Sequence, residues 1–402
     1  MIINADLHIH SHFSNSANDE MNIKTISKEA PRKGIDVVAT GDCLHSGWIK
    51  EIKTCKVIDD GTYELNGTRF ILSTEVEDKN SVHHLLYFPS SSAVEEFKEV
   101  IKKNSSNLEK VGKPSIDMSG KEIASIAKDV DALIGPAHSF TPWTSIYAHH
   151  NSLKECYGDL VDYVSFIELG LSANSDHADK ILELHRLTFL TNSDSHNPHP
   201  VRFAREFNKF EVKDAIYEEI KKAILRNSGN KPVLNVGLPP QEGKYYNSAC
   251  DSCYKQYSLE EANERNWKCD CGKHIKKGVK DRIKERATFP EPQHPYHRPP
   301  YLYIIPLSEI ITKAIGQRNP FTKISYKRWS EMISVFGNEI DVLFDVDIND
   351  IAKVTVPAIT EAIQVFREGN VIIIPGGGGK YGRIKFPQEK DVLTVSLESE
   401  ER

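Results

Sequence analysis

Asp6-Leu7-His8-Ile9-His10 is the stretch that decides the fold class, since it closes a short apolar segment that begins at Ile2. In an extended strand, side chains two residues apart point to the same face, so His8 and His10 can bind one metal ion together. The segment therefore predicts a first strand whose end carries metal ligands. The chain before residue 200 repeats this arrangement several times.

Residues that can bind metals recur at the ends of six further predicted strands, which cover 36–40, 70–77, 84–88, 132–137, 164–169 and 188–192. Amphipathic helices predicted at 23–33, 93–103, 119–128, 176–185 and 213–226 alternate with them. This alternation indicates a mainly parallel α/β sheet, either open or closed into a barrel. The ligand-type residues are His45, Glu75, His84, His138, Glu168, Asp194 and His196, while the roles of His12, Asp42 and His83 stay open. Strand ends of a barrel converge on one face, so we expect one site.

The composition is that of an ordinary globular protein. With 402 residues, 39% of them hydrophobic, the chain is long enough for two or three domains. Its formal net charge of −6 gives no global signal of nucleic-acid binding, so such a partner would need a local basic patch. We find neither an apolar run of the roughly 18 residues that span a bilayer nor a secretory leader, and therefore expect a cytoplasmic protein without a membrane partner.

The strand-end motifs resemble those of the polymerase-and-histidinol-phosphatase (PHP) superfamily of phosphoesterases. The resemblance implies a distorted seven-stranded (β/α) barrel over residues 1–228 that holds two or three divalent ions, either Zn, Mn or Mg. It also implies a ligand set: His8, His10, Glu75 and Asp194 for one ion, Glu75, His84 and His138 for the second, and His45 with His196 for the third. The chain departs from the family at Gly41-Asp42-Cys43, where Thr-Asp-His is common.

Four of the seven cysteines lie in one short window that we assign to a separate module, residues 244–286. Cys250 and Cys253 form one pair and Cys269 and Cys271 the other, which is the number and grouping that tetrahedral zinc requires. His274 is an alternative ligand, and four reduced core cysteines are the alternative reading. The pattern predicts a structural zinc ion that does no chemistry.

Basic residues follow the cysteines and also occur near the predicted metal site. Lys273, Lys276, Lys277 and Lys280 can contact phosphates, as can Arg202, Arg205 and Lys380, although a solvated helix face and exposed ion pairs are the alternatives. The run 376–379 consists of glycines and precedes Lys380, yet it is no nucleotide-binding loop, because Tyr381 stands where Ser or Thr is needed. It predicts a turn between strands at 371–374 and 382–386.

The remaining chain predicts a linker at 227–246 and a mainly helical C-terminal domain at 287–402 that includes the Gly-rich turn. We expect its helices at 308–315, 328–336 and 348–368, the first capped by Ser308 and the last closed by Gly369. The proline-rich stretch 287–300 cannot be helical.

The order of these modules resembles the endonuclease Q family over nearly the whole chain. Gly243-Lys244-Tyr245, His297-Arg298-Pro299-Pro300-Tyr301 and the Gly376–Gly382 run carry the resemblance beyond the barrel. It implies a DNA repair endonuclease, expected to be a monomer, that cuts 5′ of deaminated bases (uracil, hypoxanthine, xanthine) or abasic sites with metal-activated water. In this hypothesis Asp194 and Glu75 hold the ions, and His196 or His138 orients the water or the leaving oxygen. A small-molecule phosphatase of the histidinol-phosphate type and a non-catalytic nucleic-acid-binding protein remain the alternatives.

Overall fold

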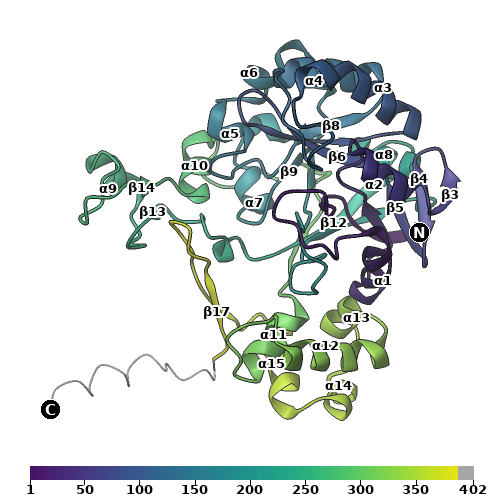
Figure 1. Cartoon of the computed structure of the whole chain (residues 1–402). Coiled ribbons are helices and arrows are strands. Elements are labelled where there is room, and N and C mark those ends of the chain that lie inside the picture. Colours follow the sequence, from purple (N-terminus) through teal and green to yellow (C-terminus); the bar gives the residue numbers. More distant parts are fainter. Residues whose placement is uncertain (388–402) are drawn as a thin grey trace.

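A computed structural model describes residues 1–387, and its strands and helices form a mixed α/β body, a small cysteine module and a helical C-terminal region (Figure 1). The strands are β1 Ile2–Asp6, β2 Val37–Ala39, β3 Lys56–Asp59, β4 Thr62–Leu65, β5 Thr68–Ile71, β6 Ser73–Glu77, β7 His83–Tyr87, β8 Leu133–Pro136, β9 Phe166–Glu168, β10 Thr188–Leu190, β11 Phe207–Glu211, β12 Lys231–Gly237, β13 Ala249–Cys250, β14 Ile275–Lys276, β15 Tyr301–Tyr303, β16 Ile372–Ile374 and β17 Arg383–Lys385. The predicted alternation of strands and helices before residue 200 is therefore present.

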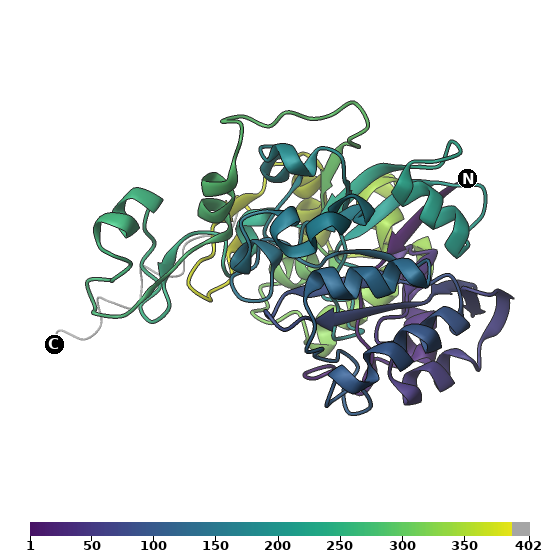
Figure 2. The same cartoon turned by 90° about the horizontal axis from the view of Figure 1, so that it is seen from above.

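The helices of the body are α1 Ile23–Lys33, α2 Ser46–Ile52, α3 Ser91–Ile101, α4 Gly120–Asp129, α5 Ile146–His149, α6 Leu153–Tyr157, α7 Ser175–Ala178 and α8 Tyr217–Leu225. Those that follow are α9 Leu259–Glu264, α10 Val279–Arg286, α11 Leu307–Ala314, α12 Lys323–Phe336, α13 Glu339–Phe344, α14 Ile348–Val354 and α15 Pro357–Arg367, and short 3-10 turns lie at 102–104, 158–163, 182–184 and 240–242. Helices α11–α15 cluster at one end of the molecule in Figure 1, and they lie behind the α/β body in the view of Figure 2. Among residues 1–387, no helix has the length and apolar character needed to cross a bilayer.

The strands of the body belong to three hydrogen-bonded sheets. The largest has the order β15-β12-β11-β1-β2-β5-β4-β3, the second is β6-β7-β8, and β9 pairs with β10. Strands β1, β2 and β5 are parallel neighbours, whereas β11 joins β1 antiparallel. A parallel bridge between Ile9 and Ser195 links the end of β1 to the segment after β10. The carboxyl ends of β1 and β10 therefore lie side by side.

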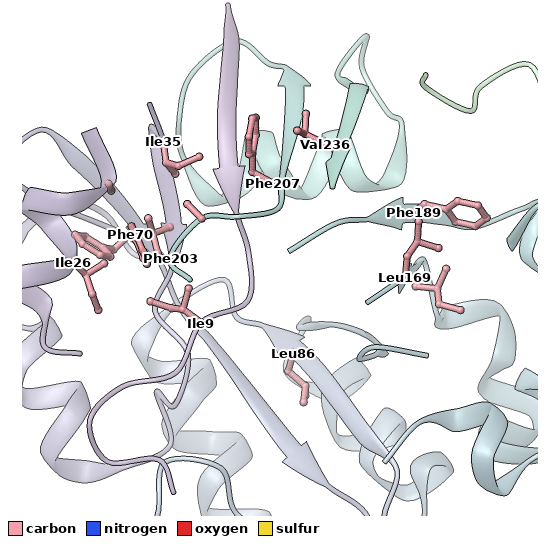
Figure 3. Packing of buried hydrophobic residues seen from close by; sticks show 14 of the residues in the cluster. Ile9, Ile26, Ile35, Phe70, Leu86, Leu169, Phe189, Phe203, Phe207 and Val236 are labelled. Carbon is pink, nitrogen blue, oxygen red and sulfur yellow. The ribbon is translucent and has the colours of Figure 1, made fainter. Parts of the chain in front are cut away.

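Buried apolar side chains fill the space between these sheets (Figure 3). Ile9, Phe70, Leu86 and Phe203 are each fully buried there, and they come from four separate segments of the chain. Such packing leaves the strand ends little freedom to move relative to one another. The core thus positions the polar residues that follow the strands.

Several predicted elements are interrupted. The strand predicted at 70–77 is two strands, β5 and β6, which join different sheets on either side of Leu72. The helix predicted at 176–185 is reduced to α7 and a 3-10 turn, and the helix at 348–368 divides into α14 and α15. Pro357 explains the second break, because its ring fits the first turn of α15 but cannot continue α14. Ser308 lies inside α11, which Pro306 precedes as N-cap residue.

The segment 227–246 is not a linker, since it contains β12, a strand of the largest sheet. The linker prediction rested on Gly237, Pro239, Pro240 and Gly243. Pro232 is tolerated because the pairing of β12 with β11 shifts register beside it, between Lys209 and Phe210. The sheet then continues to β15, which lies after the cysteine module in sequence. The last part of the predicted C-terminal domain, 388–402, lies outside the described residues.

The glycine run 376–379 connects β16 to β17, as predicted for a hairpin turn. The turn contacts the cysteine module: Asn247 N donates to Gly376 O at 3.0 Å. Gly378 has a positive φ of 64°, and a Cβ atom there would lie 2.3 Å from Cys250 O. Glycine is therefore required where this hairpin packs against the module.

Candidate metal centre

Four of the predicted ligands meet at the carboxyl end of β1. His8 Nε2 and His10 Nε2 are 3.2 Å apart, and His10 Nε2 lies 3.3 Å from both Glu75 Oε2 and Asp194 Oδ1. His8, His10 and Glu75 are buried, with 2% or less of their surface exposed. Two imidazoles and two carboxylates converging on one small volume fit a divalent cation.

A second group of donors shares Glu75. Glu75 Oε1 lies 2.8 Å from His83 Nδ1 and 3.0 Å from His138 Nε2. Because its two oxygens face different pairs of histidines, Glu75 can bridge two cations, as predicted. The second histidine of this group is His83, however, and not the predicted His84.

His84 points away from the centre. Its Nδ1 lies 2.8 Å from the Tyr157 hydroxyl and its Nε2 lies 3.3 Å from Asp78 Oδ2, in a fully buried position. Both histidines belong to β7, where consecutive side chains face opposite sides of the sheet. The structure therefore brings His83, and not His84, beside Glu75 and His138.

The predicted third ion has one of its two proposed ligands at the centre. His196 shares a donor group with His10 and Asp194, and its ring centre lies 4.2 Å from that of His10. His45 instead caps α2, where its Nδ1 accepts from Gly47 N at 3.2 Å and its ring stacks 4.0 Å from that of Phe13. Among residues 1–387, His45 does not belong to a group of three or more candidate ligands.

Carboxylates behind the ligands hold the histidine rings in place. Glu168 Oε1 lies 3.0 Å from His8 Nδ1, and its Oε2 accepts from His138 N at 2.8 Å. Asp42 Oδ1 lies 3.1 Å from His10 Nδ1 in the same way. A carboxylate on the far nitrogen fixes ring orientation and increases the basicity of the ligating nitrogen. The position of Glu168 at a strand end was the sequence signal for its part in the centre.

Asp6 orients the ligand loop and is not itself among the donor groups. Its Oδ2 accepts from Ser193 Oγ at 2.5 Å and its Oδ1 from Ser193 N at 3.1 Å, beside Asp194. Burial raises the pKa of Asp6 to about 7. Asp194 and His138 both have positive φ angles, 48° and 27°, which L-residues rarely adopt. Such strained positions persist where the surrounding contacts impose them, and they are common at functional sites.

The centre is strongly polarised. Burial acts to raise the pKa of Glu75, but His83 and Lys113 outweigh it and hold that pKa well below its usual value. Burial likewise acts to lower the pKa of His8, yet the carboxylates of Glu168 and Asp194 raise it to about 9. Cation binding at these nitrogens therefore has to displace protons, which makes metal affinity dependent on pH.

The four cysteines of the module converge as predicted. Cys250 Sγ lies 3.5 Å from Cys271 Sγ, and Cys253 Sγ lies 3.5 Å from Cys269 Sγ. Four thiolates about 2.3 Å from a central ion are about 3.8 Å apart, so this arrangement fits tetrahedral zinc. The Tyr257 hydroxyl donates to Cys269 Sγ at 3.1 Å and lowers the pKa of that thiol to about 6.

Some of the residues predicted to contact phosphate are exposed, and others are held by neighbouring protein groups. Lys273, Lys280 and Lys380 are exposed, and Lys276 Nζ lies 4.2 Å from the ring centre of the half-exposed Trp143. Lys277 is held by Glu285, with Nζ 2.6 Å from Oε1. Arg205 is buried and donates through Nε to Ser193 O at 3.3 Å, so it supports the ligand loop and is not an exposed clamp.

A pocket of about 350 Å³ opens beside the metal ligands. Asp194 and His196 form one side of it, and Arg202, Phe321 and Tyr381 are among the residues of the other sides. Phe321 comes from the C-terminal helical region and Tyr381 from the glycine hairpin, with exposed fractions of 43% and 51%. All parts of the chain except the cysteine module thus contribute to this pocket.

This donor set, in a mixed α/β fold, defines a metal-dependent phosphodiesterase. Residues 306–370 match the family described as the MJ0043 C-terminal domain. The chain is 48% identical to the lesion-specific endonuclease PfuEndoQ of Pyrococcus furiosus, with a TM-score of 0.91 and coverage of 97% of this chain and 96% of the other. It belongs to the endonuclease Q family.

Two further proteins are similar to this chain. An endonuclease Q crystallised with a 27-mer duplex substrate that carries an abasic lesion at the active site matches with 48% identity, a TM-score of 0.92 and coverage of 96% and 97%. The MJ0043 protein of Methanocaldococcus jannaschii is 47% identical over 264 residues, which are 64% of this chain and 32% of that protein. The chain thus matches about a third of the length of this archaeal relative.

Proposed function

We propose that this protein is a DNA repair endonuclease that hydrolyses the phosphodiester on the 5′ side of a deaminated base or an abasic site. The observation that carries the proposal is the pocket of about 350 Å³ whose wall includes the ligands Asp194 and His196. A nucleotide turned out of a duplex would enter this pocket with its phosphate at the metal centre. The likeness to a protein crystallised with an abasic duplex supports the substrate class.

The ions at the two sites would have different roles. The cysteine module suits structural zinc, while the nitrogen and oxygen donors of the centre accept zinc, manganese or magnesium. Bound divalent ions would supply the Lewis acidity that phosphodiester hydrolysis needs. His8, His10, Glu75, His83, His138, Asp194 and His196 are the residues that would hold them.

The chain's own residues would position the reacting groups. Glu75 joins the two donor groups and fixes their separation, and Asp194 joins His8 and His10 to His196. His138, whose backbone N donates to Glu168, and the partly exposed His196 are the histidines we assign to orienting the water or the leaving oxygen. Burial of Glu75 and His138 away from bulk water strengthens their interactions with the substrate.

Aromatic and basic side chains from different segments would contact the DNA. The Trp143 ring lies edge-on 4.6 Å from the Tyr245 ring and beneath Lys276, and the Tyr381 ring has Arg202 5.7 Å from its centre. Exposed aromatic faces beside cations bind bases and phosphates. Phe140 is 1% exposed and packs against Tyr147, so it is not among these DNA-contacting residues. We expect the enzyme to act as a cytoplasmic monomer.

The test uses end-labelled duplexes that contain one deoxyuridine, one deoxyinosine, one abasic site or no lesion, with Mn²⁺ or Mg²⁺. We expect a single metal-dependent cut immediately 5′ of each lesion and none in the plain duplex. Hydrolysis of simple phosphomonoesters without cutting of any duplex would instead identify a phosphatase. Binding of DNA without either reaction would support the non-catalytic alternative.

A further inference from the structure

Lys113 brings a positive charge to the metal centre that none of the sequence motifs indicated. Its Nζ lies 3.3 Å from Glu75 Oε2 and 3.3 Å from His83 Nε2. The residue belongs to the segment between α3 and α4, far in sequence from the strand ends that supply the ligands. About a third of its side chain, 31%, is exposed, so Lys113 borders both the buried ligands and solvent.

The segment that carries Lys113 is fixed on both sides. Gly112 N donates to Phe13 O at 2.9 Å, and a Cβ atom at Gly112 would lie 2.3 Å from Asp42 Oδ2. On the other side, Glu77 N donates to Pro114 O at 3.0 Å, next to a parallel bridge between Glu77 and Ser115. The close approach that glycine permits and the pairing with the end of β6 hold the segment across the centre. The position of Lys113 is therefore built into the fold.

The present partner of the ammonium group is a carboxylate that the proposed function assigns to cations. With divalent ions bound, both Glu75 oxygens would serve as ligands and the neighbouring cations would repel the ammonium group. A lysine held there needs another anion, because a poorly solvated charge is costly without a partner. The anion that enters the centre with the substrate is the scissile phosphate.

We propose that Lys113 binds a nonbridging oxygen of the scissile phosphate; the inference rests on the proposed function and adds a substrate-contacting residue to it. The phosphodiester carries one negative charge in the ground state and gains another as the attacking oxygen adds. A fixed cation therefore stabilises the transition state more than the bound substrate. Loss of this cation lowers kcat more than it raises KM.

The first experiment compares wild type, Lys113→Met, Lys113→Arg and the control Lys110→Met on a deoxyuridine duplex. Lys110 is an exposed lysine of the same segment. We expect Lys113→Met to lower kcat about 100-fold with KM changed less than about threefold, Lys113→Arg to restore part of the loss, and Lys110→Met to behave as wild type. Metal content per chain and thermal melting should match wild type in all variants. A fall in metal content that accounts for the lost activity would overturn the proposal, since Lys113 would then only support Glu75.

The second experiment tests contact with one particular oxygen. Duplexes carry a phosphorothioate of either configuration at the scissile position. In wild type, sulfur at the oxygen that Lys113 contacts should slow cleavage. In Lys113→Met this slowing should disappear, while the effect of sulfur in the other diastereomer should stay the same. Equal effects of both diastereomers in the two proteins would contradict the contact. If wild type cuts no lesion duplex, the proposed function fails, and bis(p-nitrophenyl) phosphate then tests Lys113 alone through the same comparison of kcat values.

Discussion

The molecule has two candidate metal sites that are constructed in opposite ways. The cysteine module takes its four ligands from one short stretch, Cys250–Cys271, and two of the four thiols are exposed. The centre of the α/β body takes ligands from His8 to His196, and those at its heart are buried between sheets. A local site has little other structure to hold it and depends on its ion for folding, whereas a distributed site is held by the core. Substitutions in the cysteine module should therefore affect its local order, and substitutions in the centre of the α/β body should affect the rate of cleavage.

The sharpest test of this contrast is Asp194→Asn. The substitution keeps the shape of a side chain that lies 3.3 Å from His10 Nε2 and removes the charge that the cations require. We expect cleavage to fall about 1000-fold, with a melting temperature near that of wild type because the core is unchanged. Single-turnover cleavage of a deoxyuridine duplex and thermal melting measure the two effects.

Asp159→Asn is the matched control, because Asp159 is an exposed residue paired with Lys121. It should cut as wild type does. Full cleavage by Asp194→Asn at saturating metal would exclude the ligand role of this residue.

A second test exploits the two adjacent histidines of β7. His83→Ala should lower cleavage about 100-fold and leave stability nearly unchanged, because buried Glu75 keeps His10, Lys113 and His138 as partners. His84→Ala should have the opposite profile, since it leaves buried partners at Tyr157 and Asp78 unsatisfied, at about 1–3 kcal/mol per group. Urea unfolding and cleavage rates of the two variants separate the effects. The reverse assignment, with His84 in the centre, predicts that the two profiles exchange.

The histidine pair also shows how far sequence reasoning reached. Period-two alternation correctly placed His8 and His10 on one face, because Asp6-Leu7-His8-Ile9-His10 defines its own register. It could not choose between His83 and His84, since adjacent residues face opposite sides and only the packing of β7 against β6 and β8 decides which side is the site. Local patterns therefore predicted the types of candidate ligand and the strands that carry them. Tertiary contacts decide which face of each strand points to the site.

The same limit explains the other differences. The cysteine cluster and the hairpin at the glycine run could be predicted, because each depends on residues close together in sequence. The pairing of β12 with β15 and the contact of Lys113 with Glu75 could not be predicted, because these partners lie far apart in the chain. Arg205 is only 12 residues from Ser193, but its sequence position does not reveal that it is buried against the ligand loop. His45 shows that a ligand-type residue after a strand can serve as a helix cap.

The cysteine module, which depends on its ion for folding, is tested with Cys271→Ser. We expect the module at 244–286 to lose order, which should appear as faster amide exchange there while the strands of the body stay protected. DNA affinity should fall about tenfold, because the exposed lysines of the module are no longer held in place, while kcat at saturating DNA changes little. Ser252→Ala, an exposed change in the same loop, is the control. A loss of kcat as large as that of Asp194→Asn would show that the two sites are coupled.

The smallest expected effect on cleavage concerns a buried carboxyl group outside the donor groups. Glu206 is fully buried and accepts from Leu238 N at 2.8 Å, and burial raises its pKa to about 8, in contrast to the lowered pKa of Glu75. Between pH 4.5 and 8 the folded state keeps a proton that the unfolded state releases. Stability from this group is therefore complete below pH 4.5 and is lost as the pH rises, with a slope of at most about 1.4 kcal/mol per pH unit.

Glu206→Gln keeps the shape and the acceptor oxygen but cannot titrate. We expect the variant to match wild type near pH 5 and to exceed it in stability at pH 8.5, with cleavage unchanged at neutral pH because Glu206 contacts none of the ligands. Urea unfolding at both pH values measures the difference, and Glu218→Gln, on the exposed face of α8, is the control. If both variants followed the wild-type pH dependence, Glu206 would be ionised in the folded protein. The α/β body would then contain a buried charge outside its metal centre. The contrast between the ionised Glu75 and a neutral Glu206 would no longer hold.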